Sequence, residues 1–530
     1  MVPSPLAHVL WTISAKPNGT LKLNKKQFAL NAASGWIAQL TFALVGFILL
    51  PYIIFRLGEQ GYGIYQLARS ALVFFMFLQL GMGPTLVRFF AKAIAKNDVE
   101  ELQRINSAAQ ALLGGLGLLA TLFGLALIPV FIHFYEIPAD LVFDTTGLLI
   151  CMVISLFLNM TVIVPQGLVF GVNRYDLTNW IEVGYHCFHL ILTIALFELI
   201  YPSIFFVGLT ILIAQIFRFT ALFSVALKYT GKAVFFSLHK VSRKTIRSVL
   251  GFSMLNLANS VAAAIFFQTP LLIIGKVLGE EMVTAFAPAL LISSAMQGFL
   301  GQTTRPLVPL ASQDREQNQG DSLGQWAISA GKLAAFVGFG IALPFAAFGP
   351  ELIGLWLGND LVWIWPVVAV MTTGVAISQV QATNYFLALG GGHIKPIVYS
   401  QIVMAVIVFF GTLFGTTRLG WSIFGVACFM AVCIFVRNTF YLAYAYSRQF
   451  SYTYINYLCS VYGVPAIITA FCIASGWVLK STFPATNLFL LGMEIAFVIG
   501  SYGAISWFFL LPRQMKNRIV AWGLSKIRTS

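Results

Sequence analysis

Charged residues are scarce in this sequence. Only 9% of its 530 residues are Asp, Glu, Lys or Arg, against about 25% in soluble domains. Acidic residues are the scarcer kind, with 18 Asp and Glu against 32 Lys and Arg. Hydrophobic residues make up 59% of the chain, and its mean hydropathy is +0.85. The composition excludes a soluble globular protein and predicts an all-α polytopic membrane protein that has lipid as its main solvent.

Motifs of several enzyme classes are also missing. The chain has no Walker A, HExxH or GxSxG motif, and its six cysteines stand in apolar runs without a CxxC pair. No outer loop is long enough for the catalytic groups expected in a glycan polymerase. The N-terminus lacks the pattern of a secretory signal. We therefore predict no enzyme activity, no catalytic residues, no cofactor and no metal site.

The apolar residues group into fourteen segments, from 29–55 to 485–511, each long enough for a helix of about 20 residues to cross a bilayer. With the N-terminus in the cytoplasm, most of the 32 basic residues fall on the cytoplasmic side. The predicted outer loops hold only Arg56, Lys276, Arg418 and Lys480. This asymmetry follows the positive-inside rule. It predicts fourteen transmembrane helices in the inner (plasma) membrane, with both termini cytoplasmic, and the basic excess needs no nucleic acid to explain it.

The chain also repeats itself at a shift of about 221 residues. Leu57-Gly58-Glu59 recurs as Leu278-Gly279-Glu280, and Arg218 with Thr220 recurs as Arg437 with Thr439 at a shift of 219. The shift covers six spans, so the two halves are parallel repeats with one orientation, a common transporter plan. The predicted parts are a cytoplasmic lead-in (1–28), an N-terminal six-helix bundle (29–228), a basic linker (229–245), a C-terminal six-helix bundle (246–447), helices 13–14 (448–511) and a basic cytoplasmic tail (512–530).

Three stretches resemble a known family. Residues 57–106 hold an LGEQGYGIY turn, a Gly81-Met82-Gly83 break and then Arg88, and GLVFGVNRYDLTNW (167–180) has a second copy in LALGGGHIKP (387–396). These features resemble the Wzx-type polysaccharide (O-antigen) flippases of the MOP exporter superfamily. The resemblance implies two six-helix bundles related by a pseudo-twofold axis, plus two C-terminal helices. It also implies transport of undecaprenyl-diphosphate-linked oligosaccharides from the inner to the outer leaflet.

Basic residues inside the predicted spans outnumber acidic ones. Each charge at the bilayer centre costs at least ~2.5–3.5 kcal/mol on insertion scales, so an anionic ligand is the natural partner for those without an internal one. Arginine suits a diphosphate because its planar fork can donate two hydrogen bonds to phosphate oxygens. We therefore predict Arg69, Arg88 and Arg305 as diphosphate-binding residues. Snorkelling is the alternative for each of them, toward the outer side for Arg69 and to cytoplasmic headgroups for Arg88 and Arg305. Arg218 and Arg437 are interpreted as structural.

Two further groups of polar residues lie within the spans. Glu182, His186 and His189 share one helical face by i, i+4, i+7 spacing, and they are candidates for proton coupling, with a buried hydrogen-bonded trio as the alternative. The amides are candidates for binding glycan hydroxyls, with interhelical hydrogen bonding as the alternative. They are Gln39, Gln79, Asn256, Asn259, Gln268 and Gln297.

The resulting hypothesis is an alternating-access flippase for polyprenyl-diphosphate-linked oligosaccharide in cell-surface polysaccharide biosynthesis, driven by an ion gradient or the membrane potential. Its partners are the lipid-linked oligosaccharide, membrane lipids and glycan polymerase or assembly proteins. A lipid II flippase is the first alternative, because its substrate carries the same lipid diphosphate. A MATE-type multidrug exporter is the second, although a cavity for cationic drugs should offer carboxylates. A non-transporting scaffold is a third.

Overall fold

The fold was analysed in a computed structural model of the full chain, which describes residues 25–79, 81–304, 321–391, 395–450, 452–482 and 488–509. The described residues are nearly all helical. By their internal contacts they divide into two compact units, Met1–Thr284 and Ala285–Ser530. The division lies within one helix, α11 (Glu280–Thr304). It does not test the domain boundaries predicted from the sequence, which remain a prediction.

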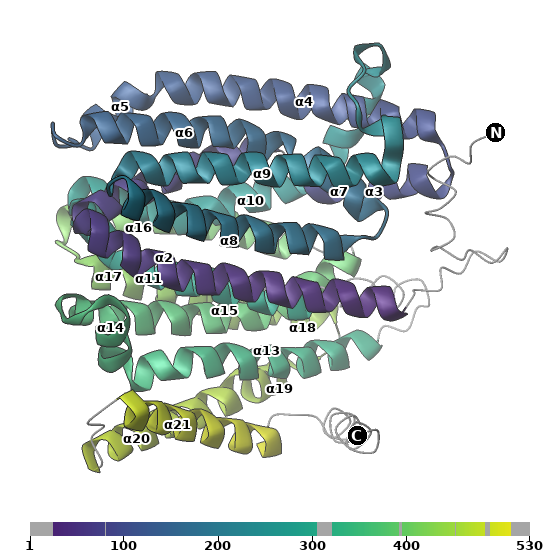
Figure 1. The fold of residues 1–530 in the computed structure, drawn as a ribbon. Helices are drawn as coiled ribbons and strands as arrows, with labels where there is room; N and C mark the ends of the chain where they lie inside the picture. Colours follow the sequence, from purple (N-terminus) through teal and green to yellow (C-terminus); the bar gives the residue numbers. More distant parts are fainter. Residues whose placement is uncertain are drawn as a thin grey trace, which may run out of the picture. The chain divides into compact units, whose positions relative to one another are not determined.

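Helices α2, α8, α9, α6 and α4 pack in succession in unit 1 (Figure 1). Each contacts the next along its length, and α10 packs on α2, α3 and α4. The elements are α2 (Lys25–Val73), η1 (Phe74–Gln79), α3 (Met82–Ala95), α4 (Val99–Ala126), α5 (Ile128–Phe134), α6 (Val142–Thr161), α7 (Ile163–Gly171), α8 (Tyr175–Leu199), α9 (Ile204–Thr230), η2 (Gly231–Val234), η3 (Leu238–Lys240) and α10 (Arg243–Val277).

Unit 2 is built around α15, which packs against α13 on one side and α17 on another. Helix α16 contacts α17, while α20 and α21 pack on each other and on α13. The elements after α11 are α13 (Asp321–Ala347), α14 (Gly349–Leu357), η4 (Asn359–Ile364), α15 (Trp365–Gly391), α16 (Lys395–Arg418), α17 (Ile423–Phe435), η5 (Val436–Leu442), α18 (Ala443–Gln449), α19 (Tyr454–Tyr457), η6 (Leu458–Gly463), α20 (Val464–Thr482) and α21 (Leu488–Phe509). Two of these elements, η5 and η6, are π-helices.

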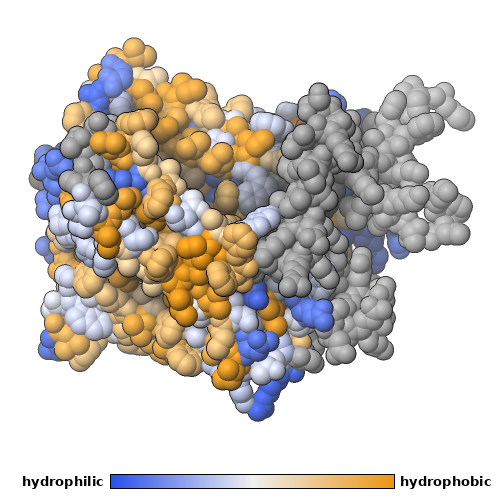
Figure 2. Space-filling view, turned by 90° about the horizontal axis from the view of Figure 1, so that it is seen from below, coloured by the Kyte–Doolittle hydropathy of each residue, from blue (hydrophilic) through white to orange (hydrophobic). Residues whose placement is uncertain are grey.

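The described residues contain 13 helical stretches that are long and apolar enough to cross a membrane. The first of them, Ala33–Gln79, has 47 residues, about twice the length that one crossing needs. It is broken at Gly58, where φ is 74° and ψ is 170°, so it covers most of the first two predicted spans. Large hydrophobic side chains lie exposed along these helices, and orange hydrophobic residues cover much of the face in Figure 2. The predicted all-α, multi-pass membrane fold is thus confirmed for the described residues.

The repeat predicted from the sequence has a counterpart in the backbone. Gly58 and Gly279 occupy the same place in the two copies of Leu-Gly-Glu, and both have positive φ, 74° and 96°. Glycine adopts this conformation without steric cost, so each copy ends one helical run and starts the next. The predicted Gly81 break is also present, since η1 gives way to α3 at Gly81, which has a left-handed φ of 62°.

The two Leu-Gly-Glu copies meet within unit 1. The Gln60 amide donates a hydrogen bond of 2.7 Å to the Glu280 carboxylate, and the Thr284 hydroxyl donates to the backbone carbonyl of Glu59. Between them, Gly63 packs against the backbone of Glu280 so closely that a Cβ at position 63 would overlap the Glu280 carbonyl. Small residues allow such close approach of helices in membranes.

Replacing Gly63 by alanine is expected to destabilise unit 1 by about 1–3 kcal/mol, because the added methyl group must push the two backbones apart. The apparent unfolding temperature of the purified protein in detergent measures this loss. Gly114→Ala is the matched control, since a Cβ at position 114 on α4 meets nothing within 4 Å. Equal unfolding temperatures for Gly63→Ala and the wild type would contradict the prediction.

Candidate functional site

Arg69 stands out on α2. It is exposed, although residues 61–68 before it and Ser70 after it are buried. The ion pairs formed among the described residues do not include Arg69. Nearby, the Gln66 amide donates a hydrogen bond of 2.5 Å to the Tyr62 hydroxyl. The polar end of Arg69 is therefore available to a ligand, while its helix is anchored by its buried neighbours.

Two of the predicted coupling residues lie close to Arg69. The positive charge of Arg69 acts on both His186 and His189 of α8, and α8 packs against α2. The ring of His186 packs on Phe42, with ring centres 5.3 Å apart, and on Tyr185 at 5.0 Å. The Nε2 atom of His189 is buried and has no hydrogen-bond partner among the described residues. The fold thus brings together a predicted diphosphate-binding residue and two predicted coupling residues.

Glu182, the third predicted coupling residue, has a partner that the sequence did not reveal. The Arg218 guanidinium on α9 donates from Nε at 2.8 Å and from Nη2 at 2.5 Å to the Glu182 Oε1 atom. The same guanidinium lies 5.8 Å from the centre of the Tyr185 ring. The side chains of Arg218 and Glu182 are only 15% and 22% exposed. This ion pair neutralises two charges inside the spanning helices of unit 1.

Only one of the other two predicted diphosphate-binding arginines lies among the described residues. Arg88 lies on α3 and is exposed. Arg305 lies outside the described residues, so its position is not tested. Neither can be placed beside Arg69, and the three-arginine diphosphate site remains a prediction.

The predicted glycan-binding amides are distributed over both units. In unit 1, Gln39 is half-buried on α2, while Asn259 and Gln268 are half-buried on α10. The Gln79 side-chain amide approaches the side-chain Oδ1 of Asn159 at 3.5 Å, which matches the alternative interpretation of an interhelical bond. Gln297 is half-buried on the part of α11 in unit 2. The side chain of Asn256 lies outside the described part of the chain.

A hydrogen-bonded network joins the starts of α2 and α8. The Arg174 guanidinium holds both oxygens of Asp176, at 2.9 and 3.0 Å, and lies over the Tyr229 ring at 5.3 Å. Gln27 donates to Asp176 at 2.8 Å, and the side-chain Oδ1 of Asn31 accepts from the backbone N–H of Asp176 at 3.0 Å. The hydrogen bond to Asp176 raises the pKa of Arg174. Sequence reasoning singled out this NRYD stretch as a family motif but missed its role as a helix-to-helix tie.

An ion pair also links α10 to the segment after α5. The Lys276 ammonium donates to the Glu136 carboxylate and to the Phe134 carbonyl, each at 2.7 Å, and lies 5.0 Å from the Phe134 ring centre. The Lys276 ammonium holds the pKa of the Glu136 carboxyl below its ordinary value. Because both groups lie at a helix end, this contact positions elements and is separate from the Arg69 cluster.

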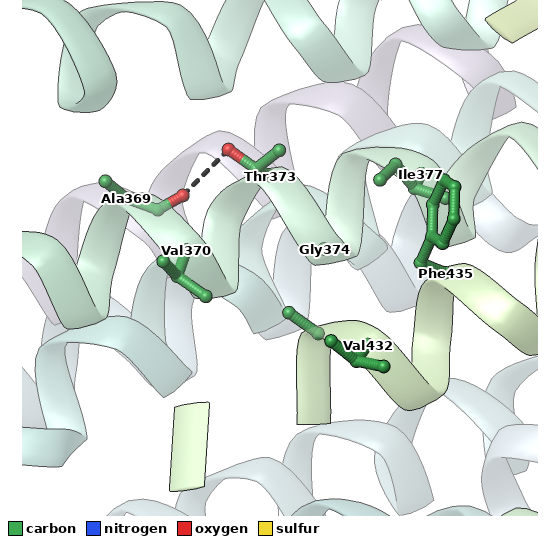
Figure 3. Close-up of a pocket in the computed structure, with 8 residues that line it drawn as sticks. Ala369, Val370, Thr373, Gly374, Ile377, Val432 and Phe435 are labelled. Atoms are coloured by element: carbon green, nitrogen blue, oxygen red, sulfur yellow. Dashed lines mark hydrogen bonds between the residues drawn. The ribbon is translucent and has the colours of Figure 1, made fainter. Parts of the chain in front are cut away.

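An apolar cavity of about 380 Å³ lies in unit 2 between α15 and α17. Figure 3 shows Val370 and Ile377 of α15 facing Val432 and Phe435 of α17. The only hydroxyl in its lining, that of Thr373, donates to the Ala369 carbonyl of its own helix at 2.8 Å. None of the residues predicted as site residues lines this cavity, so it offers packing volume for hydrocarbon and no polar recognition.

Comparisons with known proteins bear on the fold and the family. A family model described as polysaccharide biosynthesis protein matches residues 28–314. No curated protein matches the chain. Among solved structures, the chain resembles the lipid II flippase MurJ in an inward closed conformation, with 12% identity and a TM-score of 0.70 over 89% of this chain and 98% of that one.

A second solved structure is a multidrug resistance MATE family transporter of the MOP superfamily, in an inward-facing conformation. It has 14% identity and a TM-score of 0.68 over 78% of this chain and 98% of that one. A multidrug resistance MATE family transporter of the MOP superfamily in an outward-facing conformation is also similar. It has 14% identity and a TM-score of 0.59 over 81% of this chain and 96% of that one. At these identities the likeness establishes the fold of the MOP transporters.

Proposed function

Since the chain belongs to the family of polysaccharide biosynthesis proteins, with a match over residues 28–314, and has the multi-pass fold of the MOP transporters, we propose that it is a flippase. It moves a polyprenyl-diphosphate-linked oligosaccharide from the cytoplasmic to the outer leaflet of the inner membrane. Both termini are cytoplasmic. The protein acts as a transporter and not as an enzyme, and glycan polymerase or assembly proteins take up its product.

The observation that carries this proposal is the Arg69 guanidinium. It is exposed on a spanning helix, although the residues next to it in the chain are buried, and it makes no ion pair within the described part of the chain. A cation in such a place needs either water, a headgroup or an anionic passenger. A diphosphate supplies two phosphate groups that the planar guanidinium can bind through paired hydrogen bonds. Arg88 and Arg305 are the further candidates for the same diphosphate.

Transport requires a driving force, and the two histidines beside Arg69 supply a candidate for it. Burial is the main influence on the protonation of His186 and His189, and the Arg69 charge is a lesser influence on both. Binding an anion at Arg69 offsets that positive charge and so favours proton uptake by either imidazole. In this scheme substrate binding and protonation assist each other, which couples transport to a proton gradient. In this scheme Glu182 does not carry the coupling proton as an isolated carboxylate. Its role is to neutralise the Arg218 guanidinium.

Two related activities compete with this proposal. Lipid II carries the same lipid diphosphate, and the likeness to the lipid II flippase MurJ covers 89% of this chain. The family match to polysaccharide biosynthesis proteins favours the oligosaccharide. A MATE-type exporter of cationic drugs is disfavoured, because Arg69 would repel such a substrate and Glu182 is already paired with Arg218.

The test is depletion of the protein in its own host, followed by extraction of lipid-linked glycans. We expect a polyprenyl-diphosphate-linked oligosaccharide to accumulate on the cytoplasmic face, protected in intact spheroplasts from an added glycosidase, while surface polysaccharide is lost. Accumulation of lipid II with unchanged surface polysaccharide would support the first alternative. Unchanged levels of both lipid-linked glycans would refute the proposal.

A further inference from the structure

The linker between α9 and α10 is held against the side of α4 by hydrogen bonds. The side-chain amides of Asn106 and Gln110 donate to the Val234 carbonyl at 2.9 and 2.8 Å. The Lys240 ammonium donates to the side-chain oxygen of Gln103 at 2.7 Å. Because Gln103 and Gln110 are seven residues apart, the linker follows α4 for about 10 Å at 1.5 Å per residue. It runs from the level of Gln110 back toward the start of that helix.

This part of α4 is also where the helix changes from polar to apolar. Residues 99–110 hold three charged residues and three amides, whereas residues 111–126 hold no charged residue and no amide. A spanning helix enters the hydrocarbon where such residues end. Phe235 of the linker lies at a similar level, since its ring packs on Phe223 of α9 with ring centres 5.8 Å apart, and Phe223 stands seven residues before the end of α9. The deep end of the linker therefore lies at the edge of the hydrocarbon.

Large apolar side chains and basic side chains are exposed together on this linker. The apolar ones are Phe235, Phe236 and Leu238, which are 47%, 49% and 71% exposed. The exposed basic residues beside them are Lys228, Lys232, Arg243 and Arg247. These seven residues are called the linker patch. Apolar side chains at the hydrocarbon edge, together with long basic side chains that can extend to the headgroups, are typical of a segment that lies in the membrane interface.

The basic residues of the linker patch have no acidic partner within the described part of the chain. No Asp or Glu occurs between Glu198 and Glu280, so the segment itself supplies no counter-ion. On α4, which faces the linker, Glu100 and Glu101 are paired with Arg104. The ion pairs formed among the described residues do not include a base of the patch. Its positive charge is therefore open to an external anion.

We propose that the linker patch binds anionic phospholipids of the cytoplasmic leaflet. The basic side chains contact the headgroup phosphates, while Phe236 and Leu238 contact the acyl chains next to them. Clusters of four or more bases at the cytoplasmic end of a spanning helix favour anionic lipid. A soluble acidic protein would match the charge alone and would leave the apolar side chains at the hydrocarbon edge unused. The inference rests on the proposed function for its orientation in the membrane only.

The contribution of charge is tested with a double variant, Lys228→Gln with Lys232→Gln. Its matched control is Lys92→Gln with Lys96→Gln at the end of α3. Those two lysines are also exposed, and the control makes the same change in net charge. They are followed directly by the acidic residues of segment 98–101, so their surroundings are of mixed charge and should attract anionic lipid less.

The apolar contribution is tested with Phe236→Ser combined with Leu238→Ser. Phosphatidylglycerol and the zwitterionic phosphatidylcholine are each titrated into the purified full-length protein in neutral detergent, and bound lipid is counted by mass spectrometry of the intact complex. A soluble oligoglutamate peptide is titrated in parallel as the mimic of an acidic protein partner. The apparent unfolding temperature verifies that each variant is folded, which is expected because the replaced side chains are exposed.

We expect the charge variant to weaken affinity for phosphatidylglycerol about 10- to 30-fold, since each lysine contributes roughly fivefold near an anionic surface. Its affinity for phosphatidylcholine should not change. The apolar variant should bind both lipids less tightly, and the α3 control should bind both like the wild type.

Wild-type affinity for phosphatidylglycerol in both the charge variant and the apolar variant overturns the inference. It is also overturned if the apolar variant binds both lipids normally while the charge variant loses oligoglutamate binding, because the patch then serves an acidic protein. Either result leaves the proposed flippase activity standing, since that activity is decided by which lipid-linked glycan accumulates on depletion and not by phospholipid binding.

Discussion

Arg69→Ala is expected to lower export of the lipid-linked oligosaccharide at least about 10-fold at equal expression. The reason is the loss of charge-assisted hydrogen bonds to the diphosphate, which are worth about 1.5–3 kcal/mol. Arg69→Lys should retain part of the activity, because lysine keeps the charge but presents it as a point and not as a planar fork. Export is measured as surface polysaccharide in a strain that lacks the native protein.

Arg56→Ala is the matched control for Arg69. Arg56 lies on the same helix, but it forms an ion pair with Glu198 and therefore already has a protein partner. Its replacement should leave export close to the wild-type level. Arg88→Ala, tested in parallel, separates a single-arginine site from a shared one. Wild-type export in Arg69→Ala, with expression confirmed, would remove Arg69 from the substrate site.

Glu182→Gln is expected to destabilise unit 1 strongly. It leaves the Arg218 guanidinium charged and unpaired between α8 and α9, and breaking a buried pair from one side costs about 3–5 kcal/mol. The two side chains are only 15% and 22% exposed, so the pair approaches a fully buried one. The double variant Glu182→Gln with Arg218→Gln should recover much of the loss, because it removes both charges together. The apparent unfolding temperature in detergent measures each variant.

The Arg56–Glu198 pair again provides the comparison. Its side chains are 29% and 50% exposed, so Glu198→Gln should lower the unfolding temperature only slightly, because solvent screens an exposed pair. If Glu182→Gln and Glu198→Gln lowered the unfolding temperature equally, or if the double variant were the least stable of all, the Arg218–Glu182 contact would not be a buried ion pair of the kind described.

Several features of the fold could be predicted from the sequence because they depend on local properties of the chain. Lipid imposes a run of about 20 apolar residues on each crossing, which makes the spans visible in composition alone. The breaks at Gly58, Gly81 and Gly279 could be predicted because glycine reaches positive φ without steric cost. Likewise, the shared face of Glu182, His186 and His189 follows from helical periodicity.

The pairing of charges could not be predicted in this way. Nothing in the spacing of α8 and α9 shows that Arg218 turns toward Glu182, and the sequence left both Arg218 and Arg437 as structural residues. Nor does the sequence show that Arg69 lies beside His186 and His189, which are more than 110 residues away along the chain.

By itself, then, the sequence determined how many times the chain crosses the membrane, where its helices break, and that it repeats and carries surplus positive charge. Only the tertiary structure decided which of those charges are neutralised. The physical reason is that periodicity determines which residues share a face of one helix, whereas the partner of a charge depends on which faces of different helices meet. That depends on packing among segments far apart in the chain, and packing is not encoded in any one of them.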